Sequence, residues 1–240
     1  MVIEARDMHF VTLNEMVRET EDPQVTIEHC IGQRYIGAGL GGKEIRIDGT
    51  PGNALGAYLN GCEVTVYGNA QDATGDTMNS GRIIVHGSAG DVTGYAMRGG
   101  RIFIRDNVGY RCGIHMKAYK ENKPAIVIGG RTGSFLGEYQ AGGTLIVLGQ
   151  HTDGHPVIGH FCGTGMHGGE IYVRCDEIPF TLPKQVKAEK IGRLPKGEIT
   201  GLVEEWCRLF GGEAGTLTDG YFRLTPNTDN PYKTMYVNNR

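Results

Sequence analysis

The chain has 240 residues, and 39% of them are hydrophobic, which is enough to bury the core of one domain with an appendage. Its formal net charge of −3 gives no electrostatic basis for binding nucleic acid or an anionic membrane. The first residues carry acidic groups and no apolar run, so we expect no signal peptide, no membrane-spanning segment and a cytoplasmic location.

A short helix is predicted close to the N-terminus. Thr12 and Glu15 form a capping box at the start of an apolar stripe that includes Leu13. We expect residues 1–24 to cap one open end of the structure that follows, because an unpaired strand edge there would invite aggregation.

A pattern of three glycines, spaced by three and then four residues, returns along the chain. The last glycine of each copy, intact or degenerate, occupies these positions: Gly56, Gly75, Gly94, Gly113, Gly137 and Gly163. The first three intervals are 19 residues long, and the last two are 24 and 26. A period of about 20 residues indicates a stacked solenoid. We interpret the glycines as corners, where a positive φ or the missing Cβ lets the chain turn.

A short strand of alternating aliphatic residues accompanies each copy. The seven strands lie at residues 44–47, 63–66, 82–85, 101–104, 125–128, 144–147 and 170–173. Alternation places one aliphatic pair of each strand on a common inward face, beginning with Ile45 and Ile47. A second inward column follows each last glycine by three residues: Leu59, Met78, Met97, Met116, Gln140 and Met166.

These strands and corners predict the fold class. Helical repeats such as TPR or HEAT need about 34 residues or more, so we predict an all-β, single-stranded parallel β-helix over residues 25–175. This solenoid has about seven coils, and the run Val25 to Glu28 predicts a further partial turn.

The two longer copies must carry their extra residues as loops. We assign these to residues 117–122 and 150–155 and expect both loops on one side of the solenoid. Insertions in a solenoid are natural places for contact with a partner.

The repeat stops after Cys175. Residues 176–198 contain three prolines and several lysines and are predicted to be an extended connector. A helix is expected from Thr200 to Phe210, ending at Gly211, with the only tryptophan on its apolar face. The remainder of the C-terminal segment 176–240, including Asn230, Pro231 and Tyr232, is predicted to be an extended arm that packs back or reaches another subunit.

Two GxGxxG strings, at residues 37–42 and 163–168, invite a dinucleotide-binding interpretation. Such a site requires a helix directly afterwards, and strands are predicted here instead. Both strings are therefore interpreted as corners.

Four histidines gather in the longest copy: His151, His155, His160 and His167, with Cys162 among them. Their spacing matches no recognised metal-binding arrangement, so we interpret them as contact residues that could make that contact pH-sensitive. Their role stays open. The six cysteines include no CxxC pair and are interpreted as reduced, with Cys112 and Cys162 as packing residues.

Asn53, Asp72 and Asp91 occupy equivalent positions, three residues before the last glycine. They predict a polar column along one edge. Asx turns that stabilise the corners explain the column, and a Ca²⁺ or polysaccharide site is the functional alternative. We assign no catalytic, cofactor-binding or metal-binding residue to the chain.

Several segments resemble the GXGXG domain of glutamate synthase. They are residues 33–37, 68–72, 87–94, 95–100, 108–116 and 137–143. The resemblance covers about residues 4–175 and implies a right-handed β-helix that acts as a scaffold. It also implies partners: an amidotransferase (glutaminase) subunit and a synthase subunit that carries FMN and an iron–sulfur cluster, in a hetero-oligomer that makes glutamate from glutamine, 2-oxoglutarate and reductant.

Two relatives share this repeat. They are one of the subunits of formylmethanofuran dehydrogenase and the glutamate-synthase-like subunit of N-methylglutamate synthase. The segment after Asp176 favours glutamate synthase. A free-standing enzyme or sugar-binding β-helix that uses the edge of Asn53, Asp72 and Asp91 is the alternative of a different class.

Overall fold

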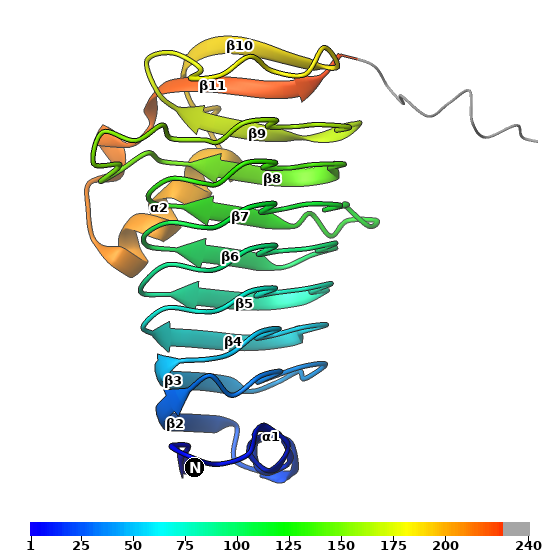
Figure 1. The fold of residues 1–240 in the computed structure, drawn as a ribbon, viewed down its shortest axis with the longest axis vertical. Helices are drawn as coiled ribbons and strands as arrows, with labels where there is room; N and C mark the ends of the chain where they lie inside the picture. The colour runs from blue at the N-terminus through cyan, green and yellow to red at the C-terminus, as the bar shows by residue number, and fades with distance from the viewer. Residues whose placement is uncertain (228–240) are drawn as a thin grey trace, which may run out of the picture.

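A computed structural model of the chain describes residues 1–227. Its main feature is one sheet of eleven strands in the order β1-β2-β3-β4-β5-β6-β7-β8-β9-β11-β10. The strands are β1 (Val2–Glu4), β2 (Gln24–Ile31), β3 (Glu44–Thr50), β4 (Asn60–Tyr67), β5 (Ser80–Val85), β6 (Arg101–Ile104), β7 (Ala125–Ile128), β8 (Ala141–Val147), β9 (Gly168–Arg174), β10 (Val186–Arg193) and β11 (Asp219–Pro226). Figure 1 shows β2 to β9 stacked one above another and running in the same direction.

All seven predicted strands of the repeat are present and pair in parallel, in the register that the glycine spacing predicts. Ile45 lies opposite Val64, Val64 opposite Ile83, and Ile83 opposite Ile102. The inward pairs of these strands are completely buried, as are all six residues of the second inward column. The repeat therefore builds one continuous core along the stack.

The segment after each strand forms a second stacked array, which we call the turn segments. Each contains one last glycine, and neighbouring turn segments are joined by backbone hydrogen bonds, such as Gly75 N–H to Leu55 O at 2.8 Å. One strand and its following turn segment make one level of the stack. Gly37, with a φ of +74°, occupies the same place 19 residues before Gly56, so the strand at Val25 opens a full level rather than a partial turn.

The last glycines turn the chain as expected and have a second reason to be glycine. Gly56 has a φ of +63°, and a Cβ there would lie 2.7 Å from Ile83 Cδ1 in the inward column. The middle glycine of a copy has a different role: at Gly133, a Cβ would meet the backbone of Gly109 at 2.9 Å. The first kind of glycine supplies the left-handed conformation, and the second allows close stacking of backbones.

Helix α1 (Phe10–Glu19) lies at the lower end of the stack, beside β1 and β2 (Figure 1). Leu13 and Val17 are buried, as the sequence predicts. The capping box was wrongly placed: His9 is the N-cap, and Thr12 lies inside the helix. The spacing of apolar residues predicts that a helix is present but does not determine its first residue, because the helix can begin one turn earlier in the sequence.

Helix α2 (Glu198–Phe210) lies against the outer face of the sheet near β7, and a short 3₁₀ helix, η1 (Ala214–Thr216), follows it. Trp206 is buried, and its indole N–H donates to the carbonyl of Ile104 at 2.8 Å. Glu205 accepts hydrogen bonds from Arg82 and Arg101, each at 2.7 Å. Together they attach α2 to two neighbouring strands.

The structure specifies two predictions for the C-terminal segment more closely. The connector contains strand β10, and the arm contains β11, which pairs antiparallel with both β9 and β10. The arm thus packs back on the stack as far as Asn227, while Asn230, Pro231 and Tyr232 lie outside the described residues. No helix within residues 1–227 has the length and apolar composition needed to cross a bilayer.

Candidate functional site

Neither GxGxxG string forms a phosphate-binding loop. Strand β3 follows the first string, and strand β9 begins within the second. A dinucleotide site of this type needs a helix N-terminus at that point. Gly41 serves stacking instead, because a Cβ there would lie 2.6 Å from the carbonyl oxygen of Asn60.

The four histidines of the longest copy do not converge on a common point. His160 packs on Phe180, with ring centroids 3.7 Å apart, while His167 Nδ1 lies 3.1 Å from the carbonyl oxygen of Gly165. Within residues 1–227, the only group of three potential ligands lies elsewhere. The grouping in sequence comes from the long insertion and does not produce a ligand set.

The polar column of Asp72 and Asp91 joins successive levels. The carboxylate of Asp72 accepts the backbone N–H of Asp91 at 2.9 Å, and that of Asp91 accepts the N–H of Tyr110 at 2.8 Å. Asn107 does the same for Arg131. Corner stabilisation was the right interpretation, but the bonds run between levels rather than within an Asx turn.

The cysteines are free and mostly buried. Burial raises the pKa of the Cys112 and Cys162 thiols to about 12, so both remain protonated at neutral pH. A thiolate is the nucleophilic form of cysteine. These two residues therefore act in packing, as predicted.

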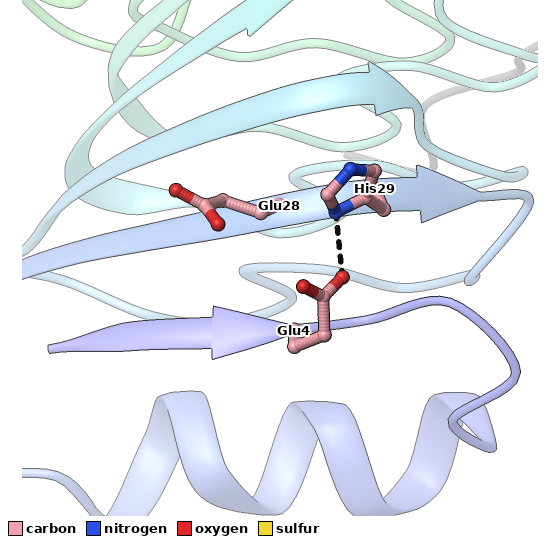
Figure 2. Close-up of side chains that lie close together, drawn as sticks. All are labelled: Glu4, Glu28 and His29. Carbon is pink, nitrogen blue, oxygen red and sulfur yellow. Dashed lines mark hydrogen bonds and ion pairs between the residues drawn. The ribbon is translucent and has the colours of Figure 1, made fainter.

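Sequence reasoning missed one cluster of potential ligands, Glu4, Glu28 and His29, shown in Figure 2. His29 Nδ1 lies 2.6 Å from Glu4 Oε1, and Arg6 Nε lies 3.1 Å from the same oxygen. All three potential ligands are exposed. Glu4 is already engaged by two basic side chains, and the contacts join β1 to β2. The parallel pairing of β1 with β2 creates this cluster, and no spacing in the sequence announces it.

The two insertions leave the stack at opposite edges, contrary to the prediction. Residues 117–122 precede β7, whereas residues 150–155 follow β8. Since β7 and β8 run parallel, the start of one and the end of the other lie at opposite ends of the strands (Figure 1). Tyr119 and Asn122 close the first insertion through a pair of backbone hydrogen bonds.

The outward side of the turn segments, which we call the turn face, carries an unexpected set of side chains. From Gly56 upward, the residues two before and two after each last glycine have positive φ values. The position two before holds alanine in two of the lower levels, at Ala54 and Ala73. In the upper levels the two positions hold Arg111, Phe135, Phe161, His115 and Tyr139.

These side chains contact one another from level to level. Phe135 stacks on Phe161 with ring centroids 5.0 Å apart, and His115 stacks on Tyr139 at 5.1 Å. An alignment of the copies on their last glycines would have shown this column.

A hollow of about 300 Å³ lies in the turn face, lined by Asp91, Val92, Tyr110, Arg111 and Phe135. The guanidinium of Arg111 lies over the Phe135 ring, 5.3 Å from its centroid, and Arg111 Nε is 3.3 Å from Glu138 Oε2. Asp91 lies in no ion pair within the described part of the chain. The hollow thus combines two aromatic residues, the guanidinium of Arg111, which is paired with Glu138, and the carboxylate of Asp91, which has no ion-pair partner among residues 1–227.

Comparison with known proteins gives three findings. The family described as GXGXG motif matches residues 8–222. An uncharacterised protein of Methanocaldococcus jannaschii is 39% identical over an alignment of 251 residues that covers 99% of this chain and 96% of the relative.

The third finding is a solved structure, the formyltransferase/hydrolase complex of Methylorubrum extorquens with methylofuran. One of its chains is 23% identical, with a TM-score of 0.64, and the match covers 85% of this chain and 73% of that one. At this identity the likeness establishes a shared fold.

Proposed function

The chain belongs to the GXGXG motif family, and from that premise we propose that it is a structural, non-catalytic subunit of a multi-subunit enzyme complex. The observation that carries the proposal is the use of its polar side chains. Asp72, Asp91 and Asn107 are engaged by backbone N–H groups of the next level. One oxygen of each of these side chains is thus used in stacking, while a large aromatic surface is left exposed.

Two complexes fit this role. The solved structural neighbour belongs to a formyltransferase/hydrolase complex, and it lends more support to a formyl-transfer assembly than the comparisons lend to glutamate synthase. In this proposal the chain corresponds to the subunit of formylmethanofuran dehydrogenase that shares the glycine repeat.

Glutamate synthase is the second candidate, and the signature segments at residues 87–94 and 108–116 favour it. Here the chain would hold an amidotransferase subunit and an FMN/iron–sulfur synthase subunit so that ammonia passes between them. The same proposal includes a right-handed winding of the β-helix. It also divides the chain into an N-terminal cap (1–24), the β-helix (25–175) and a C-terminal segment (176–240).

Purification from the native cell tests the proposal. The chain, tagged at its own locus, should bring with it subunits of different sequence, identified by mass spectrometry. The recovered complex is then assayed for glutamine-dependent glutamate formation and for formyl transfer, and only one activity is expected. Recovery of the chain alone from its native cell would contradict the proposal.

The alternative of a free-standing enzyme has its own test. Isolated chain is examined for Ca²⁺ binding and for activity on polysaccharides, together with the variants Asp72→Ala and Asp91→Ala. We expect neither binding nor activity in the unaltered chain. An activity that both substitutions abolish would replace the scaffold proposal.

A further inference from the structure

The turn face bears bulky side chains where the backbone disfavours them. Phe135 has a φ of +63° and Phe161 a φ of +61°, values at which bulky residues are uncommon and strained. Alanine fills the equivalent place at Ala54 and Ala73, so the fold itself does not require an aromatic ring. Phe161 is exposed and Phe135 is half-buried, so strain retained at these surface positions points to a role outside the fold.

The aromatic side chains form one surface. Phe135 and Phe161, which precede the last glycines of their levels, stack on each other, and Tyr95 and His115, which follow theirs, meet edge-on at 5.9 Å. Even so, 57% of Tyr110 and 55% of Phe161 remain accessible to solvent. Exposed aromatic clusters of this kind mark binding surfaces, because aromatic rings supply large contact area at low entropic cost.

Other elements cover parts of the remaining sides of the stack. Helix α2 packs on the outer face of the sheet, α1 lies at the lower end, and the pair β10 and β11 closes the upper end (Figure 1). These elements leave Tyr58, Tyr95, Tyr110 and Phe161 exposed on the turn face.

The charges of the turn face define what it would bind. Arg111 is neutralised by Glu138, whereas Asp72, Asp76 and Asp91 lie in no ion pair within residues 1–227. The face therefore presents carboxylates next to aromatic rings. A lysine or arginine side chain satisfies both, through ion pairing with a carboxylate and through cation–π contact with a ring.

We propose that the turn face between Asp72 and Phe161 docks a basic segment of a partner subunit, with one Lys or Arg side chain held in the hollow at Asp91. This inference rests on the proposed function, since it requires a partner subunit. The hollow supplies the anchor site: Asp91 provides the charge and Tyr110 provides a ring, while Arg111, which is paired with Glu138, already lies over one face of Phe135. Anchors of this kind carry most of the binding free energy in protein interfaces.

Titration of purified partner subunits against variants of the full chain tests the inference. The partners are those identified by mass spectrometry with the unaltered chain, then expressed separately. The double variant Phe135→Ala/Phe161→Ala introduces the residue that Ala54 and Ala73 already provide, so the fold should be retained. We expect its Kd to rise about thirtyfold, as for loss of a hot spot.

A second variant removes charge while preserving the backbone hydrogen bonds. Asp72→Asn/Asp91→Asn keeps the acceptor oxygen, as Asn107 does with Arg131 in the unaltered chain. We expect binding about fivefold weaker at low salt and a flatter dependence of Kd on salt concentration. Tyr67→Ala is the control, because Tyr67 is similarly exposed but stacks on His86 beside α2, on the sheet side. It should bind like the unaltered chain.

Four results would overturn the inference. Partners could bind the aromatic and Asn variants as tightly as the unaltered chain, or Tyr67→Ala could weaken binding equally. The isolated chain could form a dimer that Phe135→Ala/Phe161→Ala dissociates, which would identify a second copy as the occupant. Removal of residues 228–240 could abolish the effect of the aromatic variant, which would identify the chain's own C-terminal segment. If the unaltered chain retains no partner at all, the proposed function fails instead.

Discussion

At the scale of single residues, the repeat depends on where a Cβ can be accommodated. Gly56 combines a left-handed backbone with an inward column that leaves no room for a methyl group, whereas Gly39 has a φ of +68° and no heavy atom within 4 Å of a Cβ. Substituting alanine at Gly39 would therefore cause backbone strain alone, whereas alanine at Gly56 would cause both strain and steric overlap. Sequence spacing identifies Gly56 as a corner, but the distance to Ile83 follows only from the stacking of levels.

Gly56→Ala should destabilise the fold by roughly 2–4 kcal/mol, because strain adds to displacement of Ile83. Gly39→Ala should cost about 1 kcal/mol, from strain alone. Urea denaturation monitored by circular dichroism measures both. Equal losses for the two variants would show that steric overlap contributes nothing.

His86 makes stability depend on pH. Burial, and to a smaller extent Arg105, lowers the pKa of His86 below its usual value. Histidine in the unfolded chain titrates near 6.5, so between that pH and the lower folded pKa the unfolded chain binds more protons. Stability that is present at pH 7 is therefore lost as the pH falls through this window.

His86→Phe should reduce the loss of stability between pH 7 and pH 5 while keeping ring contacts with Tyr67 and Phe210. The measurement is the urea midpoint of both proteins at each pH. The same pH dependence in both proteins would exclude His86 as its source.

At the scale of elements, α2 is held to the sheet by a polar network as well as by apolar packing. Glu205 is largely buried and forms ion pairs with Arg82 of β5 and Arg101 of β6. Removing it leaves both guanidinium groups without their shared carboxylate. Glu204, next to it, is exposed and provides a matched control.

Glu205→Ala should lower the free energy of unfolding by roughly 1–3 kcal/mol, a value reduced by the partial exposure of Arg82 and Arg101. Glu204→Ala should change it by no more than about 0.5 kcal/mol. Thermal unfolding of the two variants compares them directly. A loss as large for Glu204→Ala would show that the effect does not come from the network.

Sequence periodicity predicted the strands of the repeat, but it did not predict the strands that lie beyond the last copy. Each of the strands β3 to β9 has a short aliphatic run, and its inward residues are buried. In β10 the residues from Lys187 to Lys190 are all exposed, so alternation of apolar residues gives no signal there. Its position follows from pairing with β11, and long-range antiparallel pairing leaves no local pattern in the sequence.

The candidate site divides in the same way. The column of Asp72 and Asp91 was found from the repeat, because equivalent positions stack. The turn face was missed, since the copies were compared for their glycines and strands rather than for the residues two positions from each last glycine. To predict that the two insertions lie at opposite edges, one must know at which end of a strand each insertion lies. The spacing of the glycines alone does not give this.

At the scale of the whole molecule, the stack within residues 1–227 has closed ends, a sheet face that α2 covers in part, and a turn face that no helix covers. This asymmetry suits a subunit whose work is to hold other subunits. The polar side chains engaged in stacking and the buried thiols of Cys112 and Cys162 fit the same role. The central claim is therefore that the chain acts within an assembly of unlike subunits.

Native mass spectrometry of the protein isolated from its own cell tests this claim most directly. The account predicts an assembly heavier than the 26.1 kDa chain that releases subunits of different mass on activation. A mass of 26.1 kDa alone, or only whole multiples of it, would contradict the account.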